Sequence, residues 1–89
     1  MIKVGVASFR EHEFDHIKEY VPDGDKLEDT WAEQQVKVEE TLSGFRSQGM
    51  FAVPVTLTLA ALMKFETDHG VRPDGGKRAR MASELVVKG

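Results

Sequence analysis

Met50–Phe65 reads MFAVPVTLTLAALMKF, and Lys64 is its only charged residue. Every other long segment of the 89-residue chain is at least half polar. We therefore expect this stretch to form the centre of the core, with the remaining segments packed around it. Apolar and β-branched residues over Met50–Val55 favour a strand, and Pro54 confines such a strand to a sheet edge or to a strand end.

A helix is predicted directly after this strand. Thr56 or Thr58 can supply its N-cap through a side-chain oxygen. The helix is expected to run to His69, because Gly70 followed shortly by Pro73 is typical of a C-terminal stop. The apolar stretch is thus predicted to be half strand and half helix.

Hydrophobic periodicity and capping patterns predict four further elements. They are a strand over Ile2–Ala7, a helix over Phe9–Tyr20 capped by Ser8 and Glu11, a long helix over Lys26–Ser47 capped by Asp25 and Glu28, and a helix over Lys77–Val87. Two short segments, Val36–Val38 and Leu85–Val87, are also compatible with strands. Gly49 is expected to close the long helix, which Gly44 can end earlier or kink.

These elements predict an α+β fold in a single domain over residues 1–89. Three or four helices are expected to pack on a small sheet of two or three strands. A strand is not stable alone, so Ile2–Ala7 must pair within the chain or across a homodimer.

The composition narrows the class of protein. The chain has no cysteine, which excludes disulfides, thiolate metal sites and a cysteine nucleophile and fits a cytoplasmic location. We find no signal-peptide pattern at the N-terminus. The sixteen-residue apolar stretch contains Pro54 and is shorter than the roughly 20 residues of a membrane helix, so no membrane partner is expected.

Charge is unevenly distributed along the chain. The net charge is −3, but residues 10–40 hold eleven acidic residues against four basic ones. Such an acidic surface can dock on a basic partner protein, and the candidate partner-binding residues are Glu28, Asp29, Trp31 and Glu33. The simpler interpretation is that the carboxylates are only solvated and that Trp31 belongs to the core.

A basic segment follows the predicted Gly70–Gly76 turn. Lys77, Arg78 and Arg80 lie near the start of the last predicted helix and can contact phosphates, in an arrangement loosely like a helix-turn-helix. This is the alternative function, nucleic-acid binding. The simpler interpretation is a solvated helix end with a few basic residues.

The string His12-Glu13-Phe14-Asp15-His16 matches H-E-x-x-H and resembles the zincin metalloprotease motif over these five residues. The resemblance implies His12 and His16 as zinc ligands and Glu13 as the group that activates water. Charged neighbours and the lack of an identifiable third ligand favour a solvated helix face instead. No catalytic residue and no cofactor are therefore assigned.

The leading hypothesis is a small non-enzymatic binding or regulatory protein that acts through protein–protein contacts. An inhibitor that uses the acidic helical face is one form of it. A nucleic-acid-binding regulator is the alternative, and a zinc-dependent hydrolase is the third. No family is recognised from the sequence.

Overall fold

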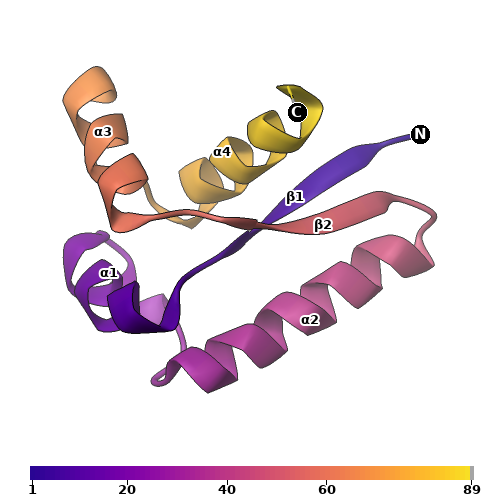
Figure 1. The fold of residues 1–89 in the computed structure, drawn as a ribbon, viewed down its shortest axis with the longest axis horizontal. Helices are drawn as coiled ribbons and strands as arrows, with labels where there is room; N and C mark the ends of the chain where they lie inside the picture. Colours follow the sequence, from indigo (N-terminus) through magenta and orange to yellow (C-terminus); the bar gives the residue numbers. More distant parts are fainter. Residues whose placement is uncertain (89) are drawn as a thin grey trace.

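The fold is built on two parallel strands that are joined through a helical crossover (Figure 1). A computed structural model describes residues 1–88. Lys3 pairs with Phe51, and the register continues to Ser8 and Thr56. The elements are β1 (Lys3–Ser8), a 3-10 turn (Glu11–Glu13), α1 (Phe14–Tyr20), a 3-10 turn (Gly24–Lys26), α2 (Trp31–Ser47), β2 (Phe51–Thr56), α3 (Leu59–His69) and α4 (Gly75–Lys88).

Helices cover both faces of this strand pair (Figure 1). Because side chains alternate along a strand, Val4 and Val6 share one face with Ala52. That face packs against Val38 and Leu42 of α2. The opposite face, which holds Gly5, is covered by α4. This is the usual condition for parallel strands, which are rarely left open to water on either face.

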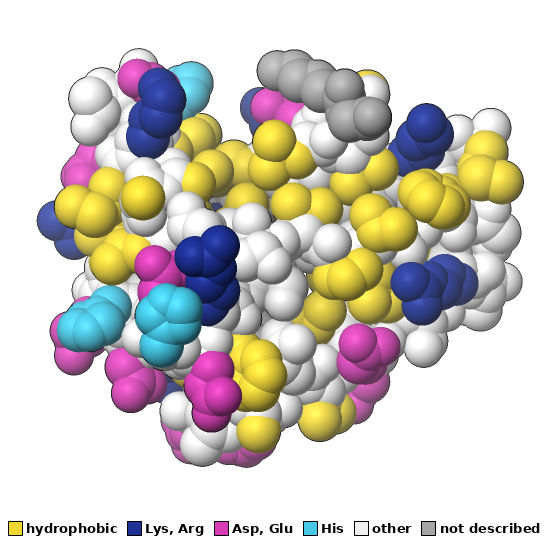
Figure 2. All heavy atoms as spheres, in the orientation of Figure 1, with side chains coloured by type: hydrophobic (Ala, Val, Ile, Leu, Met, Phe, Trp, Pro, Cys, Tyr) yellow, Lys and Arg dark blue, Asp and Glu magenta, His cyan; other side chains and the backbone are white. Residues whose placement is uncertain are grey.

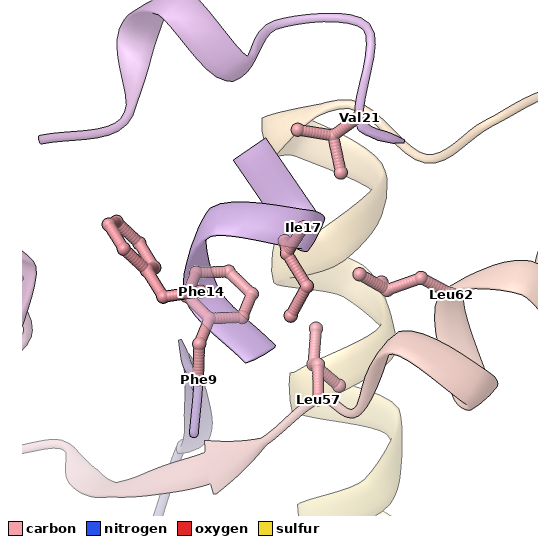
Figure 3. Packing of buried hydrophobic residues seen from close by; sticks show 6 residues of the cluster. All are labelled: Phe9, Phe14, Ile17, Val21, Leu57 and Leu62. Carbon is pink, nitrogen blue, oxygen red and sulfur yellow. The ribbon is translucent and has the colours of Figure 1, made fainter. Parts of the chain in front are cut away.

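The larger apolar cluster lies where the carboxyl ends of the strands meet α1 and α3. Phe14 and Ile17 of α1 and Leu62 of α3 converge there (Figure 3). Leu57, which follows β2, completes the contact and is almost fully buried. Leu57 and Leu62 from the second half of the predicted core stretch therefore lie in the core, in contact with a helix from the first quarter of the chain, whereas Met63 is half exposed.

The α+β class is confirmed, with four α-helices and a two-stranded sheet in the described residues. Of the two predicted N-caps of α3, Thr58 is the one used and Thr56 belongs to β2, and the predicted stop at Gly70 is correct. Thr58 Oγ1 accepts a hydrogen bond from the Ala61 amide, and Gly70 has a φ of 78°, in the left-handed region that suits glycine. Both assignments depend on neighbouring residues alone.

Two predicted helix starts are wrong. Ser8 belongs to β1, and its hydroxyl donates to Gln35 Oε1 rather than capping a helix. The long helix begins at Trp31 instead of Lys26, because Thr30 is its N-cap: Thr30 Oγ1 accepts from the Glu33 amide and donates to the Glu33 carboxylate. Several residue pairs fit the same short pattern, and the flanking fold decides which pair is used.

The alternative strand assignments are also wrong. Val36–Val38 lies within α2, and Leu85–Val87 lies within α4. Gly44 does not end α2, which stops at Ser47, just before Gly49. The last helix begins at Gly75, two residues before the predicted start.

Pro54 lies inside β2 without loss of a ladder hydrogen bond. The amides of Phe51 and Leu57 donate to β1, so by alternation the backbone nitrogen of Pro54 faces the free edge of the sheet. Arg46 of α2 covers the same edge, where its Nε and Nη2 donate to the Ala52 carbonyl at 3.1 and 2.9 Å. The predicted edge position of Pro54 is therefore correct, and this edge resists pairing with another strand.

The contact between β1 and α4 requires glycine at position 5. A Cβ atom on Gly5 would lie 2.2 Å from the Ala82 carbonyl oxygen. Ser83 Oγ accepts from the Gly5 amide at 3.2 Å and lies 3.4 Å from the Gly5 carbonyl oxygen. The backbone of α4 thus packs directly on the backbone of β1. The Ser83 hydroxyl contacts both the amide and the carbonyl of Gly5, which point away from β2.

Substitution Gly5→Ala is expected to destabilise the protein by about 2 kcal/mol or more, because backbone must move to admit the methyl group. Urea unfolding measures the change. Gly44→Ala is the matched control: a methyl group there would meet no neighbouring residue within 4 Å, and alanine favours a helix interior by about 0.5–1 kcal/mol. Equal effects at the two glycines would contradict the close packing.

Candidate functional site

The outer face of α2 is acidic and carries one exposed apolar residue. Val36 is 57% exposed, and Glu33 and Glu40 lie three residues before it and four after it, on the same side of the helix. The opposite side of α2 carries Val38 and Leu42, which are buried against the sheet. We call Glu33, Val36, Glu39 and Glu40, together with the exposed Asp29 two residues before the helix, the α2 outer face.

Shallow hollows border Val36. One, of about 270 Å³, is lined by Glu28, Glu33, Val36, Lys37 and Glu40. Within the described residues, Asp29, Glu39 and Glu40 form no side-chain hydrogen bond or ion pair. Glu33 is held by the Thr30 cap, and the Glu28 amide donates to Gln34 Oε1. The predicted acidic residues are therefore close together, and most of their carboxylates are free to meet a partner.

Trp31 is turned inward rather than presented on this face. Its Nε1 donates to the Phe9 carbonyl at 2.6 Å, and its half-buried ring packs against the main apolar cluster. Trp31 therefore has a structural task, because it ties the start of α2 to the residue that follows β1. Glu33, which interacts with the Thr30 cap, also has one.

The basic C-terminal segment is divided by its packing. Arg78 has a side chain only 6% exposed. Its Nη1 donates to Asp23 Oδ1 at 2.6 Å and to the Pro73 carbonyl at 3.0 Å, and its Nη2 donates to Asp23 Oδ2 at 3.2 Å. Arg78 thus cannot reach a phosphate without breaking this pair. Lys77 and Arg80 remain exposed.

Two carboxylates occupy the start of α4, where a phosphate would bind. Asp23 accepts a hydrogen bond from the Gly75 amide at 3.0 Å, and Asp74 accepts one from the Lys77 amide at 3.0 Å. The hydrogen bonds from Arg78 hold the pKa of the Asp23 carboxyl below its ordinary value, and the Gly75 amide acts in the same direction. The ion pair therefore joins the turn after α1 to the start of α4.

The H-E-x-x-H string does not form a continuous helical site. His12 lies in a 3-10 turn and His16 in α1, and both are exposed. Glu13 accepts a hydrogen bond from the Leu59 amide at 3.3 Å, at the start of α3. No three His, Asp or Glu residues among the described residues are grouped closely enough to hold a metal ion.

A second polar cluster, which no sequence pattern indicates, joins the ends of α1 and α3. Tyr20 donates its hydroxyl hydrogen to Glu66 at 2.6 Å, and Arg72 Nε donates to the other Glu66 oxygen at 3.2 Å. The Arg72 guanidinium also lies 4.5 Å from the centre of the Tyr20 ring. The bond from Tyr20 and then the pairing with Arg72 lower the pKa of Glu66. Because Tyr20 is 46 positions from Glu66, only the fold brings it to this pair.

Comparison with protein-family models, with curated proteins and with solved structures finds no match to this chain. Among residues 1–88, no helix has the length and apolar character needed to cross a membrane. Function is therefore inferred from the surfaces described above.

We expect Asp23→Asn to destabilise the protein by about 3 kcal/mol, because Arg78 would keep its charge in a buried position without a full partner. Chemical unfolding at pH 7 measures the loss. Lys64→Ala is the control, because it removes an exposed ion pair with Asp68 and should cost less than about 1 kcal/mol. A similar small loss for both variants would contradict a structural role for Asp23.

The same pair predicts a pH dependence. The folded-state pKa of Asp23 is lower than the ordinary 3.8, so its stabilisation is complete above that value. It is lost as the pH falls from about 3.8 through the lower folded-state pKa. The difference in unfolding free energy between the wild type and Asp23→Asn should shrink over this range. A difference that stays constant down to pH 2 would contradict the assignment.

Proposed function

We propose that the protein is a small, non-enzymatic binding protein that acts through protein–protein contacts, with the α2 outer face as its docking surface. The observation that carries the proposal is the exposed Val36 with carboxylates on both sides of it along the helix. An apolar centre with a charged rim is the arrangement by which interfaces combine affinity with specificity.

The chemistry of this face points to the kind of partner. Asp29, Glu39 and Glu40 favour a surface rich in lysine and arginine, and Val36 favours one apolar contact at its middle. A basic groove fits both requirements. A protein that occupies such a groove excludes the ligand that the groove normally binds, so the role that we propose is that of a regulator or inhibitor of a basic partner.

The rigidity of α2 supports this use. Its inner side is buried against both strands, and its first turn is fixed by the Thr30 N-cap, which hydrogen-bonds both the amide and the carboxylate of Glu33. The outer face is therefore presented without ordering a loop, which lowers the entropic cost of binding.

The alternative of nucleic-acid binding rests on Lys77 and Arg80, since Arg78 is paired with Asp23. Two cations make few phosphate contacts, so its affinity for nucleic acid would be weak and strongly dependent on salt. The acidic face is the surface that the geometry favours.

A triple variant tests the docking surface. Asp29→Lys, Glu39→Lys and Glu40→Lys reverse three carboxylates that are exposed on the α2 outer face. We expect partner binding to fall by about tenfold or more while the unfolding midpoint stays close to that of the wild type. Affinity capture from cells that produce the protein, followed by quantitative mass spectrometry, measures the partner that is retained.

The matched control carries the same change in charge at another place: Glu11→Lys, Asp15→Lys and Glu19→Lys, three exposed positions in the first 3-10 turn and α1. It should retain the partner. If both triple variants lose the partner equally, the effect is due to net charge alone. If the α2 variant still retains the partner, the α2 outer face is not the docking surface.

A further inference from the structure

A groove that is separate from the acidic face lies between α3 and α4. One wall is formed by α3 residues spaced four apart, and the other by α4 residues spaced four apart. We define the α3–α4 groove by Ala61, Phe65 and His69 on α3 and by Lys77, Met81 and Leu85 on α4. Hydrophobic side chains gather between these helices in Figure 2.

The groove is continuous along α4. A hollow of about 240 Å³ at the end of β2 is lined by Leu57, Ala61 and Leu85, among others, and another of about 400 Å³ lies beside Phe65. The two hollows share Met81 and Glu84, so they adjoin. Leu85 is 53% exposed at one end of the groove. Helix α4 thus buries one side on β1, and on its groove side Met81 is only partly covered by the main apolar cluster while Leu85 is exposed.

Charge is unequal along the groove. His69, Lys77 and Arg80 gather where α3 ends and α4 begins, whereas the opposite end, at Ala61 and Leu85, is apolar. Among the described residues, Glu84 is the only carboxylate that lines either hollow. A molecule that fits should therefore be apolar along its length and negatively charged at one end.

We propose that this groove binds an amphipathic helix of a partner protein whose acidic end lies against Lys77 and Arg80. The α4 wall of the groove is about 12 Å long between Lys77 and Leu85, which corresponds to about two turns of the bound helix. Apolar residues spaced by three or four positions would contact Met81 and Leu85, as in other helix-in-groove complexes.

The walls favour a helix over an extended peptide. Both are α-helices, whose backbone groups are already paired, so the occupant must satisfy its own backbone hydrogen bonds. The neighbouring edge of β2 does not offer an alternative, because Pro54 lacks an amide hydrogen and Arg46 already binds the Ala52 carbonyl.

A second copy of the chain fits less well. Its acidic helix, α2, presents Val36 as its one large exposed apolar residue, which cannot fill both hollows. The proposal is also independent of the proposed function, because the groove lies across the sheet from the α2 outer face (Figure 1).

A display library of randomised 14-residue peptides, selected on the intact protein, provides the test. We expect the enriched peptides to carry apolar residues at helical spacing with Asp or Glu clustered at one end. Ala61→Phe should fill the groove and weaken the binding of these peptides by about tenfold or more. Ala60→Phe, on the neighbouring exposed residue, should leave their binding unchanged.

Two further variants separate the apolar and charged contributions. Leu85→Gln should weaken binding, and Val87→Gln, which changes a more exposed residue that does not line either hollow, should leave it unchanged. Arg80→Glu should weaken the binding of the acidic peptides. It should strengthen the binding of versions in which lysine replaces the acidic cluster.

Other outcomes would overturn the proposal. These are enrichment of basic or extended peptides, no enrichment, or binding that Ala61→Phe and Ala60→Phe affect alike. Sedimentation that shows a dimer abolished by Ala61→Phe would assign the groove to a second copy instead. Failure of these tests leaves the α2 triple variant interpretable, since none of its positions lines the groove.

Discussion

The rest of the structure depends on the contact between the backbone of β1 at Gly5 and the backbone of α4 at Ala82. Two parallel strands offer too little pairing to persist alone, and they need cover on both faces. Helix α2 supplies one cover through ordinary side-chain packing. The other cover is possible only because position 5 has no side chain, which lets the helix approach the strand directly. Ser83 then adds a polar contact to the outer groups of Gly5.

The Asp23–Arg78 ion pair holds the same helix at its first turn. Its position explains why a basic cluster in the sequence is a poor guide to function here. Arg78 neutralises a nearly buried carboxylate and stays out of the solvent, while its neighbours Lys77 and Arg80 face outward. The carboxylates of the α2 outer face differ, because they lie opposite a buried apolar stripe and stay in water.

How much the sequence predicts depends on the range of the interactions. The caps of α3, Thr58 and Gly70, involve residues within one helical turn and are predictable. The start of α2 is not, because Asp25–Glu28 and Thr30–Glu33 fit the same pattern and only the second is used. Parallel pairing of β1 with β2 and the hydrogen bond from Trp31 to the Phe9 carbonyl follow from contacts between distant segments. That Trp31 belongs to the core is one of the two interpretations open from the sequence, and it is correct. The α3–α4 groove depends on how α4 packs on β1. The acidic face is predictable because helical periodicity separates Val38 and Leu42 from the carboxylates.

The Gly5–Ser83 contact also bears on how the protein is made. Its two residues are 78 positions apart, so a ribosome that adds about 5–20 residues per second takes about 4–16 s to supply the second after the first. Helix α2 can shield one face of β1 earlier, but the glycine face stays bare until α4 has emerged. During that interval β1 can pair with β2, which is made before α4, but the strand pair has only one of its two covers. Among the described elements, the glycine face of β1 is therefore the last part of the sheet to be covered.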